Sequence, residues 1–151
     1  MSDLQICPIG IEDIEDLVPL VDSYRGFYGQ QPSIDTGQYL TERIGEGSAL
    51  GFIAKVEGHP AGFTLIYPTF STVALAPIWL LNDLYVDENH RRQGIANALL
   101  ERAEDEARQA GAARIWLRTT LDNAPARALY ENRGWVLDDI FCRYDLALKT
   151  S

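Results

Sequence analysis

A strand, a helix and a second strand follow one another in the middle of the chain, and this order constrains the fold more than any other feature. Residues Ala76–Asp87 form a nearly continuous apolar run, typical of a strand that is covered on both faces. Residues Gly94–Ala110 place apolar side chains on one helical face, and Gly111 can end that helix. The apolar segment Ala113–Thr119 predicts the second strand. Two strands joined by one helix lie parallel, with a right-handed crossover.

The other segments predict a run of strands before this unit, and a helix and a strand after it. Alternating apolar residues predict strands at Leu4–Gly10, Ala49–Val56, Pro60–Tyr67 and Phe141–Leu148. Helical spacing and capping residues predict helices within Ile11–Gly29, Ser33–Glu46 and Asp122–Gly134. The order favours a mixed sheet in an α/β or α+β domain, and disfavours a symmetric doubly wound sheet.

The composition indicates one acidic domain that spans residues 1–151. Hydrophobic residues make up 46% of the chain and charged residues 23%, which is an ordinary globular mixture. The formal net charge of −9 disfavours nucleic acid and anionic membranes as partners, and favours cationic molecules. The charge leaves open a simpler alternative, a well-solvated acidic surface.

Two features bear on the cellular compartment. Cys7 and Cys142 are too few and too far apart for a disulfide framework, which favours a reducing interior. The first ten residues lack the pattern of a secretion signal, and the apolar run Val73–Leu81 is too short to cross a bilayer. We therefore expect a cytoplasmic protein that does not bind membranes.

The segment "HRRQGIA" lies where the central strand gives way to the helix. The first backbone N–H groups of a helix and its dipole favour an anion there. Gly94 and the small Ala96 would let a phosphate approach, and Arg91 and Arg92 add positive charge. Alternatively, Gly94 permits a turn and the arginines are solvated neighbours of acidic residues. This segment alone does not separate the two interpretations.

Two motifs together resemble the GNAT superfamily of N-acetyltransferases. The segment "LYVDENHRRQGIANALL" is similar to the family's acetyl-coenzyme A motif, [QR]-x-x-G-x-[GA] after an apolar strand, with Arg91, Gly94 and Ala96 in those positions. The segment "NAPARALYENRGW" resembles a second family motif. Its matching residues are Asn123, Ala126, Leu129, Tyr130, Gly134 and Trp135.

The resemblance implies a fold, a co-substrate and its site. The fold would be a twisted mixed sheet of six to seven strands with about four helices, and many relatives form homodimers. Acetyl-coenzyme A would donate its acetyl group directly to an amine, with no metal. Pantetheine would pair with the backbone of Leu84, Tyr85 and Val86. The rest of the coenzyme would contact Arg91, Arg92, Gln93, Gly94, Ile95, Ala96, Asn97, Asn123 and Ala126.

Within the superfamily, "WLLNDLYVDENHRRQGIA" is similar to the diamine (spermidine/spermine) acetyltransferases. Those enzymes carry Glu-Asp on the central strand, where this chain has Asn82 and Asp83. An amine is protonated at neutral pH and must lose a proton before attack, so Asp83 is a candidate base, or else an anchor or a structural acid. Adjacent strand residues point to opposite faces, so Asn82 and Asp83 cannot both face the crevice unless a bulge intervenes.

The resemblance also assigns Tyr130 as the acid that protonates the leaving thiolate, whereas a core aromatic is the alternative. The loop that contains Tyr28 could be a wall of the acceptor pocket or simply core. We predict an acetyl-coenzyme A-dependent N-acetyltransferase acting on a primary amine of a small molecule, such as a polyamine or an amino acid. The alternatives are a catalytically silent acetyl-coenzyme A sensor and an acetyltransferase for a protein or peptide amine.

Overall fold

The computed structural model describes residues 3–149 and divides the chain into two compact units, Met1–Arg118 and Thr119–Ser151. Each unit is described by itself. The first contains the sheet and three of the α-helices, and the second contains the last helix. The single domain expected over residues 1–151 stays a prediction.

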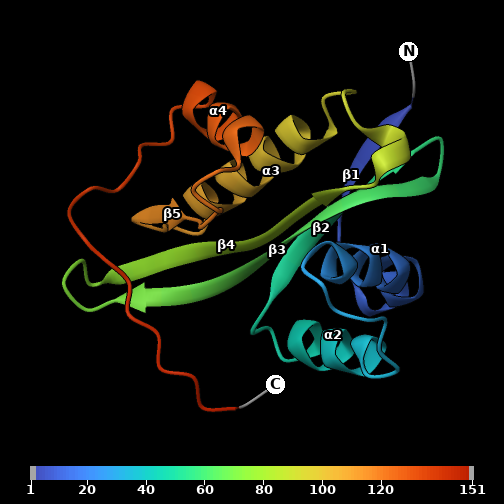
Figure 1. Ribbon diagram of the computed structural model, residues 1–151, viewed down its shortest axis with the longest axis horizontal. Coiled ribbons are helices and arrows are strands. Elements are labelled where there is room, and N and C mark those ends of the chain that lie inside the picture. The colour runs from blue at the N-terminus through green and yellow to red at the C-terminus, as the bar shows by residue number, and fades with distance from the viewer. Residues whose placement is uncertain (1–2, 150–151) are drawn as a thin grey trace. The chain divides into compact units, whose positions relative to one another are not determined.

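One mixed sheet organises the first unit (Figure 1). Its strands follow chain order across the sheet, and the first four pair antiparallel. The fifth strand pairs parallel to the fourth, as the strand–helix–strand order predicts. The strands are β1 (Leu4–Pro8), β2 (Leu50–Val56), β3 (His59–Ser71), β4 (Ala76–Val86) and β5 (Arg114–Trp116).

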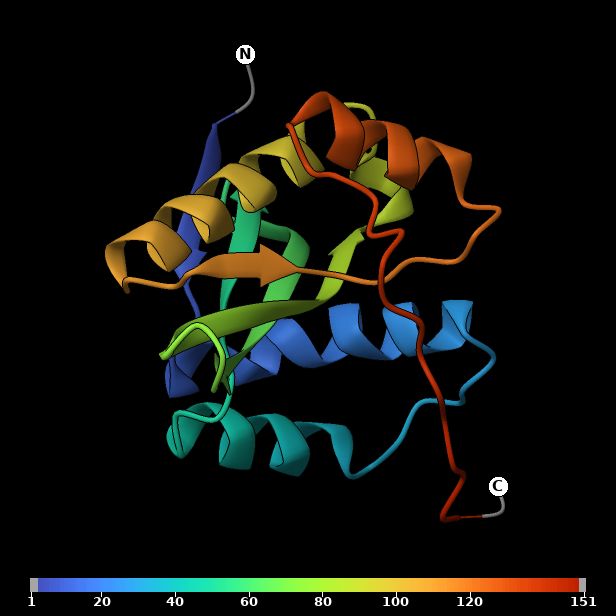
Figure 2. The same cartoon turned by 90° about the vertical axis from the view of Figure 1, so that its left-hand side faces the viewer.

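Helices cover both faces of this sheet (Figures 1 and 2). Helices α1 (Ile14–Phe27) and α2 (Thr36–Gly45) lie on one face, and α3 (Ile95–Gln109) lies on the other. Two short 3₁₀ turns, η1 (Ile11–Asp13) and η2 (Glu88–His90), precede α1 and α3. Helix α3 is the crossover between β4 and β5, which explains why it packs across the sheet.

Apolar side chains on the two faces form separate packing layers. On the α1 and α2 side, buried residues of these helices meet the middle of β2 and β3: Leu17, Leu20, Val21, Leu40, Ile53, Phe63 and Leu65. On the other side, α3 buries the apolar stripe that its helical spacing predicts: Ile95, Leu99, Leu100, Ala103 and Ala107. Both layers hold the middle of β3 and β4 in place, where the candidate site lies.

The second unit contains α4 (Ala124–Asn132), which begins as the sequence predicts. The Asn123 side chain accepts a hydrogen bond from the Ala126 N–H at 3.3 Å, so Asn123 caps the helix. The prediction of a strand at Phe141–Leu148 is wrong, because these residues do not form a strand in the structure. An alternating pattern forms a strand only where a neighbouring backbone completes the ladder. Residues 3–149 therefore contain five strands, not six to seven, together with four α-helices.

Within residues 3–149, no helix combines the length and the apolar character that crossing a bilayer requires.

Candidate active site

A β-bulge in β4 decides where the acid on this strand points. Leu65 of β3 lies opposite Asp83, and the next residue, Ile66, lies opposite Leu81. Asn82 is therefore an extra residue without a cross-strand partner. Since Leu65 and Ile66 face opposite sides of the sheet, Asp83 shares the face of Leu65, and Leu81 shares the face of Ile66. The bulge thus turns Asp83 toward α1 and α2.

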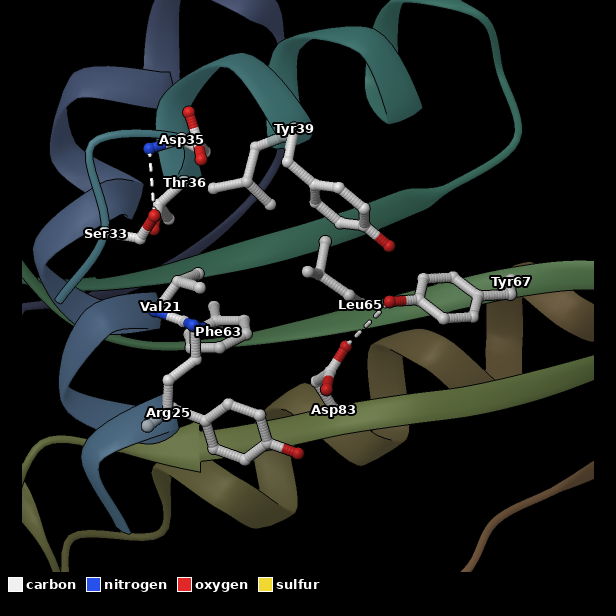
Figure 3. A pocket seen from close by; sticks show the side chains of 12 residues that line it. Val21, Arg25, Ser33, Asp35, Thr36, Tyr39, Phe63, Leu65, Tyr67 and Asp83 are labelled. Atoms are coloured by element: carbon white, nitrogen blue, oxygen red, sulfur yellow. Dashed lines mark hydrogen bonds between the residues drawn. The ribbon is translucent and has the colours of Figure 1, made fainter. Parts of the chain in front are cut away.

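Asp83 lines a cavity of about 310 Å³ beneath α1 and α2 (Figure 3). The cavity brings together residues of α1, α2, β3, β4 and the segment that precedes α2. They are Val21, Tyr24, Arg25, Ser33, Asp35, Thr36, Tyr39, Leu40, Phe63, Leu65, Tyr67 and Asp83. Asn82 is not among these lining residues, so Asp83 is the member of the pair that faces the cavity.

The carboxylate of Asp83 is held by neighbouring polar groups. The Tyr67 hydroxyl donates to Asp83 Oδ2 at 3.3 Å, and Asn82 Nδ2 donates to Oδ1 at 3.1 Å. Burial raises the pKa of Asp83 above its usual value, although hydrogen bonds from Asn82, Tyr24 and Tyr67 partly oppose this rise. A carboxylate with a raised pKa accepts a proton more readily, which suits a general base.

Two tyrosines border the same carboxylate and stay neutral. Burial raises the pKa values of Tyr24 and Tyr67, and the negative charge of Asp83 raises both further. Both side chains therefore keep their hydroxyl protons at neutral pH and act as donors toward Asp83. The ring of Tyr24 also packs against Phe63 and Tyr85, with centroids 5.6 and 5.8 Å apart, so these aromatics fix one wall of the cavity.

The last part of β4 leaves one edge open to a ligand. Strand β5 pairs with β4 only at Ile78, Trp79 and Leu80, whereas β4 continues to Val86. Among the described residues, the segment Leu84–Val86 pairs with β3 alone. An unpaired strand edge presents backbone groups that can bind an extended ligand. This is where the family resemblance places the pantetheine arm.

The start of α3 forms a backbone site suited to an anion. Gly94 caps the helix with φ +77°, and Arg92 has φ +63°, so the chain makes two left-handed steps before Ile95. The first turn of α3 carries no acidic residue, and Ala98 N–H bonds Gly94 O at 3.0 Å. Amides that precede this first helical bond, together with the helix dipole, favour negative charge. Arg92, Gln93 and Gly94 are exposed, so the residues fit a pyrophosphate.

Arg91 fastens this loop to the end of β4. Its Nε donates to Val86 O at 3.0 Å, and its guanidinium lies 5.7 Å from the centre of the Tyr85 ring. Asp87 instead contacts His90, with 3.3 Å between Oδ2 and Nδ1. The contacts of Arg91 join the strand end to the start of α3.

Other predicted site residues lie elsewhere. Tyr28 is 56% exposed and packs on Tyr24 with ring centroids 5.2 Å apart, but the cavity lining does not include it. Tyr130 belongs to α4 in the second unit, where its ring lies 6.0 Å from that of Trp135. Asn123 and Ala126 form the cap of the same helix. The roles of these residues stay predictions.

The sequence reasoning missed several cavity residues. Tyr67 follows Phe63 and Leu65 at every second position of β3, a period that places all three on one face of the sheet. This signal was available in the sequence. Asp35 and Tyr39 come from the start of α2, and no local pattern indicates that α2 packs over β3 near Asp83. Within residues 3–149, no group of three or more His, Cys, Asp or Glu residues could hold a metal ion.

Comparisons with known proteins identify the family. The model of the "Acetyltransferase (GNAT) family" matches residues 17–135. The uncharacterized N-acetyltransferase YhfO of Bacillus subtilis (strain 168) is 38% identical over 135 residues, which cover 89% of this chain and 91% of the relative. The thialysine N-epsilon-acetyltransferase of Caenorhabditis elegans is 28% identical over 142 residues, which cover 90% of this chain and 85% of the relative.

A solved structure agrees with this result. The crystal structure of a probable acetyltransferase superposes with a TM-score of 0.92 at 33% identity, covering 97% of this chain and 99% of that chain. The matched region includes the bulged strand β4, the start of α3 and the capped helix α4, which carry the motifs. The chain therefore belongs to the GNAT family of acetyltransferases and is an N-acetyltransferase.

Proposed function

We propose that this enzyme transfers the acetyl group of acetyl-coenzyme A directly to a primary amine of a small molecule. The observation that carries the proposal is the half-buried Asp83 carboxylate, which lines a cavity of about 310 Å³ together with four aromatic side chains. A cavity of this volume is typical of small-molecule sites. An open groove beside Asp83 would favour a protein amine instead.

The open edge of β4 and the start of α3 are the proposed coenzyme site. The backbone of Leu84–Val86 would hold the pantetheine arm, and the amides from Arg92 to Asn97 would hold the pyrophosphate. Arg91 would hold the end of β4 beside the start of α3 through its hydrogen bond to Val86 O. Asn123 and Ala126 complete the coenzyme contacts that the family resemblance implies.

Asp83 is the proposed base. An alkylammonium group has a pKa near 10.4 and is almost wholly protonated at neutral pH. Asp83 accepts one ammonium proton, the amine nitrogen then bonds to the acetyl carbon, and the carbon–sulfur bond breaks. Tyr130 is the proposed donor of the proton that the leaving thiolate takes up, and the second proton that the nitrogen loses as the amide forms restores the Tyr130 hydroxyl. The raised pKa of Asp83 supports its part in this scheme.

The similarity of β4 to the diamine acetyltransferases belongs to the proposal and concerns the acceptor. Asn82 occupies the position of the first acid of that group. Because Asn82 donates to Asp83, it orients the acid that remains. We also propose that the enzyme is a homodimer in the cytoplasm. The family resemblance and the small number of cysteines support these two points, and sedimentation of the purified protein tests the dimer.

A panel of small amines tests the proposed function. Purified enzyme is incubated with acetyl-coenzyme A and each amine, and free thiol is measured. We expect thiol release that depends on a primary amine, with the acetylated amine identified by mass spectrometry. Binding of acetyl-coenzyme A without turnover of any amine would favour a sensor. Turnover of peptide amines alone would favour a protein acceptor.

A further inference from the structure

Thr64 is a polar residue inside the core, on the opposite face of the sheet from the acceptor cavity. It lies in β3 between Phe63 and Leu65, which line the cavity, so its own side chain points to the face that α3 covers. It is fully buried, whereas most threonines are in contact with water. A buried hydroxyl needs a hydrogen-bond partner, and the identity of that partner indicates the role of the residue.

The partner of Thr64 is the backbone at the bulge of β4. Its Oγ1 donates to the carbonyl oxygen of Asp83 at 2.8 Å. This carbonyl belongs to the residue that directly follows the extra residue Asn82, where the ladder between β3 and β4 changes register. A bulge disrupts the regular backbone pairing, and a side-chain donor can replace part of what is lost. Thr64 therefore holds β4 at the point where its geometry is irregular.

Thr64 is itself fixed by both neighbouring strands. A Cβ on Gly51 of β2 would overlap the carbonyl oxygen of Thr64, so β2 packs closely against β3 at this residue. On its other side, Thr64 lies opposite Leu84 of β4. A donor that is held between two strands can set the direction of the carbonyl that it binds.

The direction of the Asp83 carbonyl also sets the direction of the next amide. The peptide between Asp83 and Leu84 is trans, so its carbonyl and its N–H point in opposite directions. Because the carbonyl points to Thr64 on β3, the Leu84 N–H points to the open edge of β4. The Val86 carbonyl, two positions later, faces the same edge and accepts its hydrogen bond from Arg91.

We propose that Thr64 is a positioning residue for the acetyl transfer. Through its bond to the Asp83 carbonyl, it directs the Asp83 side chain to the acceptor cavity and the Leu84 N–H to the edge where the acetyl group would lie. An N–H in that place can stabilise the negative charge that develops on the thioester oxygen. Thr64 acts through this peptide alone, because it is buried away from both substrates. The inference rests on the proposed function, which supplies the roles of Asp83 and of the open edge.

Substitutions of Thr64 that separate its hydroxyl from its shape test the inference. Thr64→Val keeps the branched side chain and removes the hydroxyl, whereas Thr64→Ser keeps the hydroxyl. We expect kcat of Thr64→Val to fall by about tenfold, because the base and the amide are both misplaced. KM for acetyl-coenzyme A and for the amine should change by less than about threefold, since Thr64 binds neither. Thr64→Ser should keep kcat within about threefold of the unmodified enzyme.

Thr69 provides a matched control on the same pair of strands. Its Oγ1 also donates from β3 to a carbonyl of β4, that of Ile78, at 2.7 Å, but in a regular part of the ladder. Thr69→Val loses the same kind of hydrogen bond, so we expect a lower Tm and an unchanged kcat. Measuring Tm and kcat for every variant separates a loss of stability from a loss of catalysis.

Several results would overturn the inference. One is an unchanged kcat in folded Thr64→Val, and another is an equal fall of kcat in Thr64→Val and Thr69→Val. If Thr64→Val does not fold, as judged by circular dichroism, Thr64→Ser and Thr64→Ala are compared instead. Both lose the methyl group and differ in the hydroxyl, so equal kcat values in these two variants would also overturn the inference. Failure of the unmodified enzyme to acetylate any amine in a broad panel would contradict the proposed function itself, which is a different result.

Discussion

The proposed coenzyme side and the proposed acceptor side of this enzyme are built in different ways. The coenzyme side uses the backbone of β4 and of the start of α3, two segments that follow one another in the chain. The acceptor side uses side chains from α1, α2, β3 and β4, which lie far apart in the sequence. A site made of contiguous backbone leaves a motif in the sequence, whereas a site made of distant side chains does not. Substitutions on the two sides should therefore have separable effects.

The largest expected effect is on the acceptor side, in the chemical step. Replacing Asp83 with Asn removes the proposed base and keeps the shape of the side chain. We expect kcat/KM for the amine to fall by about 10²- to 10⁴-fold, with the affinity for acetyl-coenzyme A unchanged in calorimetry. Asp105→Asn, an exposed acid on α3, is the control. Equal loss of coenzyme affinity would contradict the separation of the two sides.

The second effect is on the coenzyme side. Gly94 has φ +77°, which a β-branched side chain rarely adopts, so Gly94→Val should distort the anion site. We expect the dissociation constant for acetyl-coenzyme A to rise by about tenfold or more. Gly111 ends the same helix with φ +76°, so Gly111→Val is subject to similar strain at the other end. That control should lose stability but keep its affinity for the coenzyme.

The third effect concerns the pH dependence of the acceptor side. The hydrogen bond from Tyr67 lowers the pKa of Asp83, so Tyr67→Phe should raise this pKa and move the acidic limb of the kcat/KM profile to higher pH. On the acidic limb we expect a loss of about three- to tenfold. Tyr144→Phe, at a position that is 92% exposed, should leave the profile in place. An unmoved limb would show that Asp83 is not the group that titrates.

The smallest effect is on stability. Burial raises the folded-state pKa of Asp83 above its unfolded value, which is near 3.9. The neutral carboxyl therefore stabilises the fold below the unfolded pKa, and this contribution is lost as the pH rises through the folded-state pKa. We expect Asp83→Asn to raise Tm by about 2–4 °C at pH 8 and to have little effect at pH 3.5. A lower Tm of Asp83→Asn at pH 8 would contradict the inference that the charged carboxylate destabilises the folded protein.

The sequence predicts the central part of the fold well because each signal there is local. The apolar run of β4, the helical stripe of α3 and the capped start of α4 depend on neighbours within a few positions, and all three are confirmed. The prediction of a strand at Phe141–Leu148 is wrong. Alternation of apolar and polar residues is a property of one segment, whereas a strand forms only when a second segment pairs with it. A local pattern therefore predicts an element but not its partner.

The acceptor side was harder to predict for the same reason. The sequence identified Asp83 but left open whether it or Asn82 faces the site, because the answer depends on the register between β3 and β4. Asp35 was missed because the cavity joins it to Asp83, which lies 48 positions later in the chain. Such contacts follow from tertiary packing, which one sequence does not encode as a visible pattern.

The extra residue in β4 shifts the alternation of side chains between the two faces of the sheet by one position. Before Asn82, the alternation directs Trp79 and Leu81 to the α3 layer, and after it the odd-numbered Asp83 and Tyr85 face α1 and α2 instead. The position of the acid therefore depends on the bulge in the strand as well as on the chemistry of its residues. Regular alternation over the same residues, without the bulge, would place Asp83 with Leu81 in the opposite layer. Deleting Asn82 would leave Asp83 opposite Leu65 and Leu81 opposite Ile66, so the acid would keep its face while the strand lost its bulge.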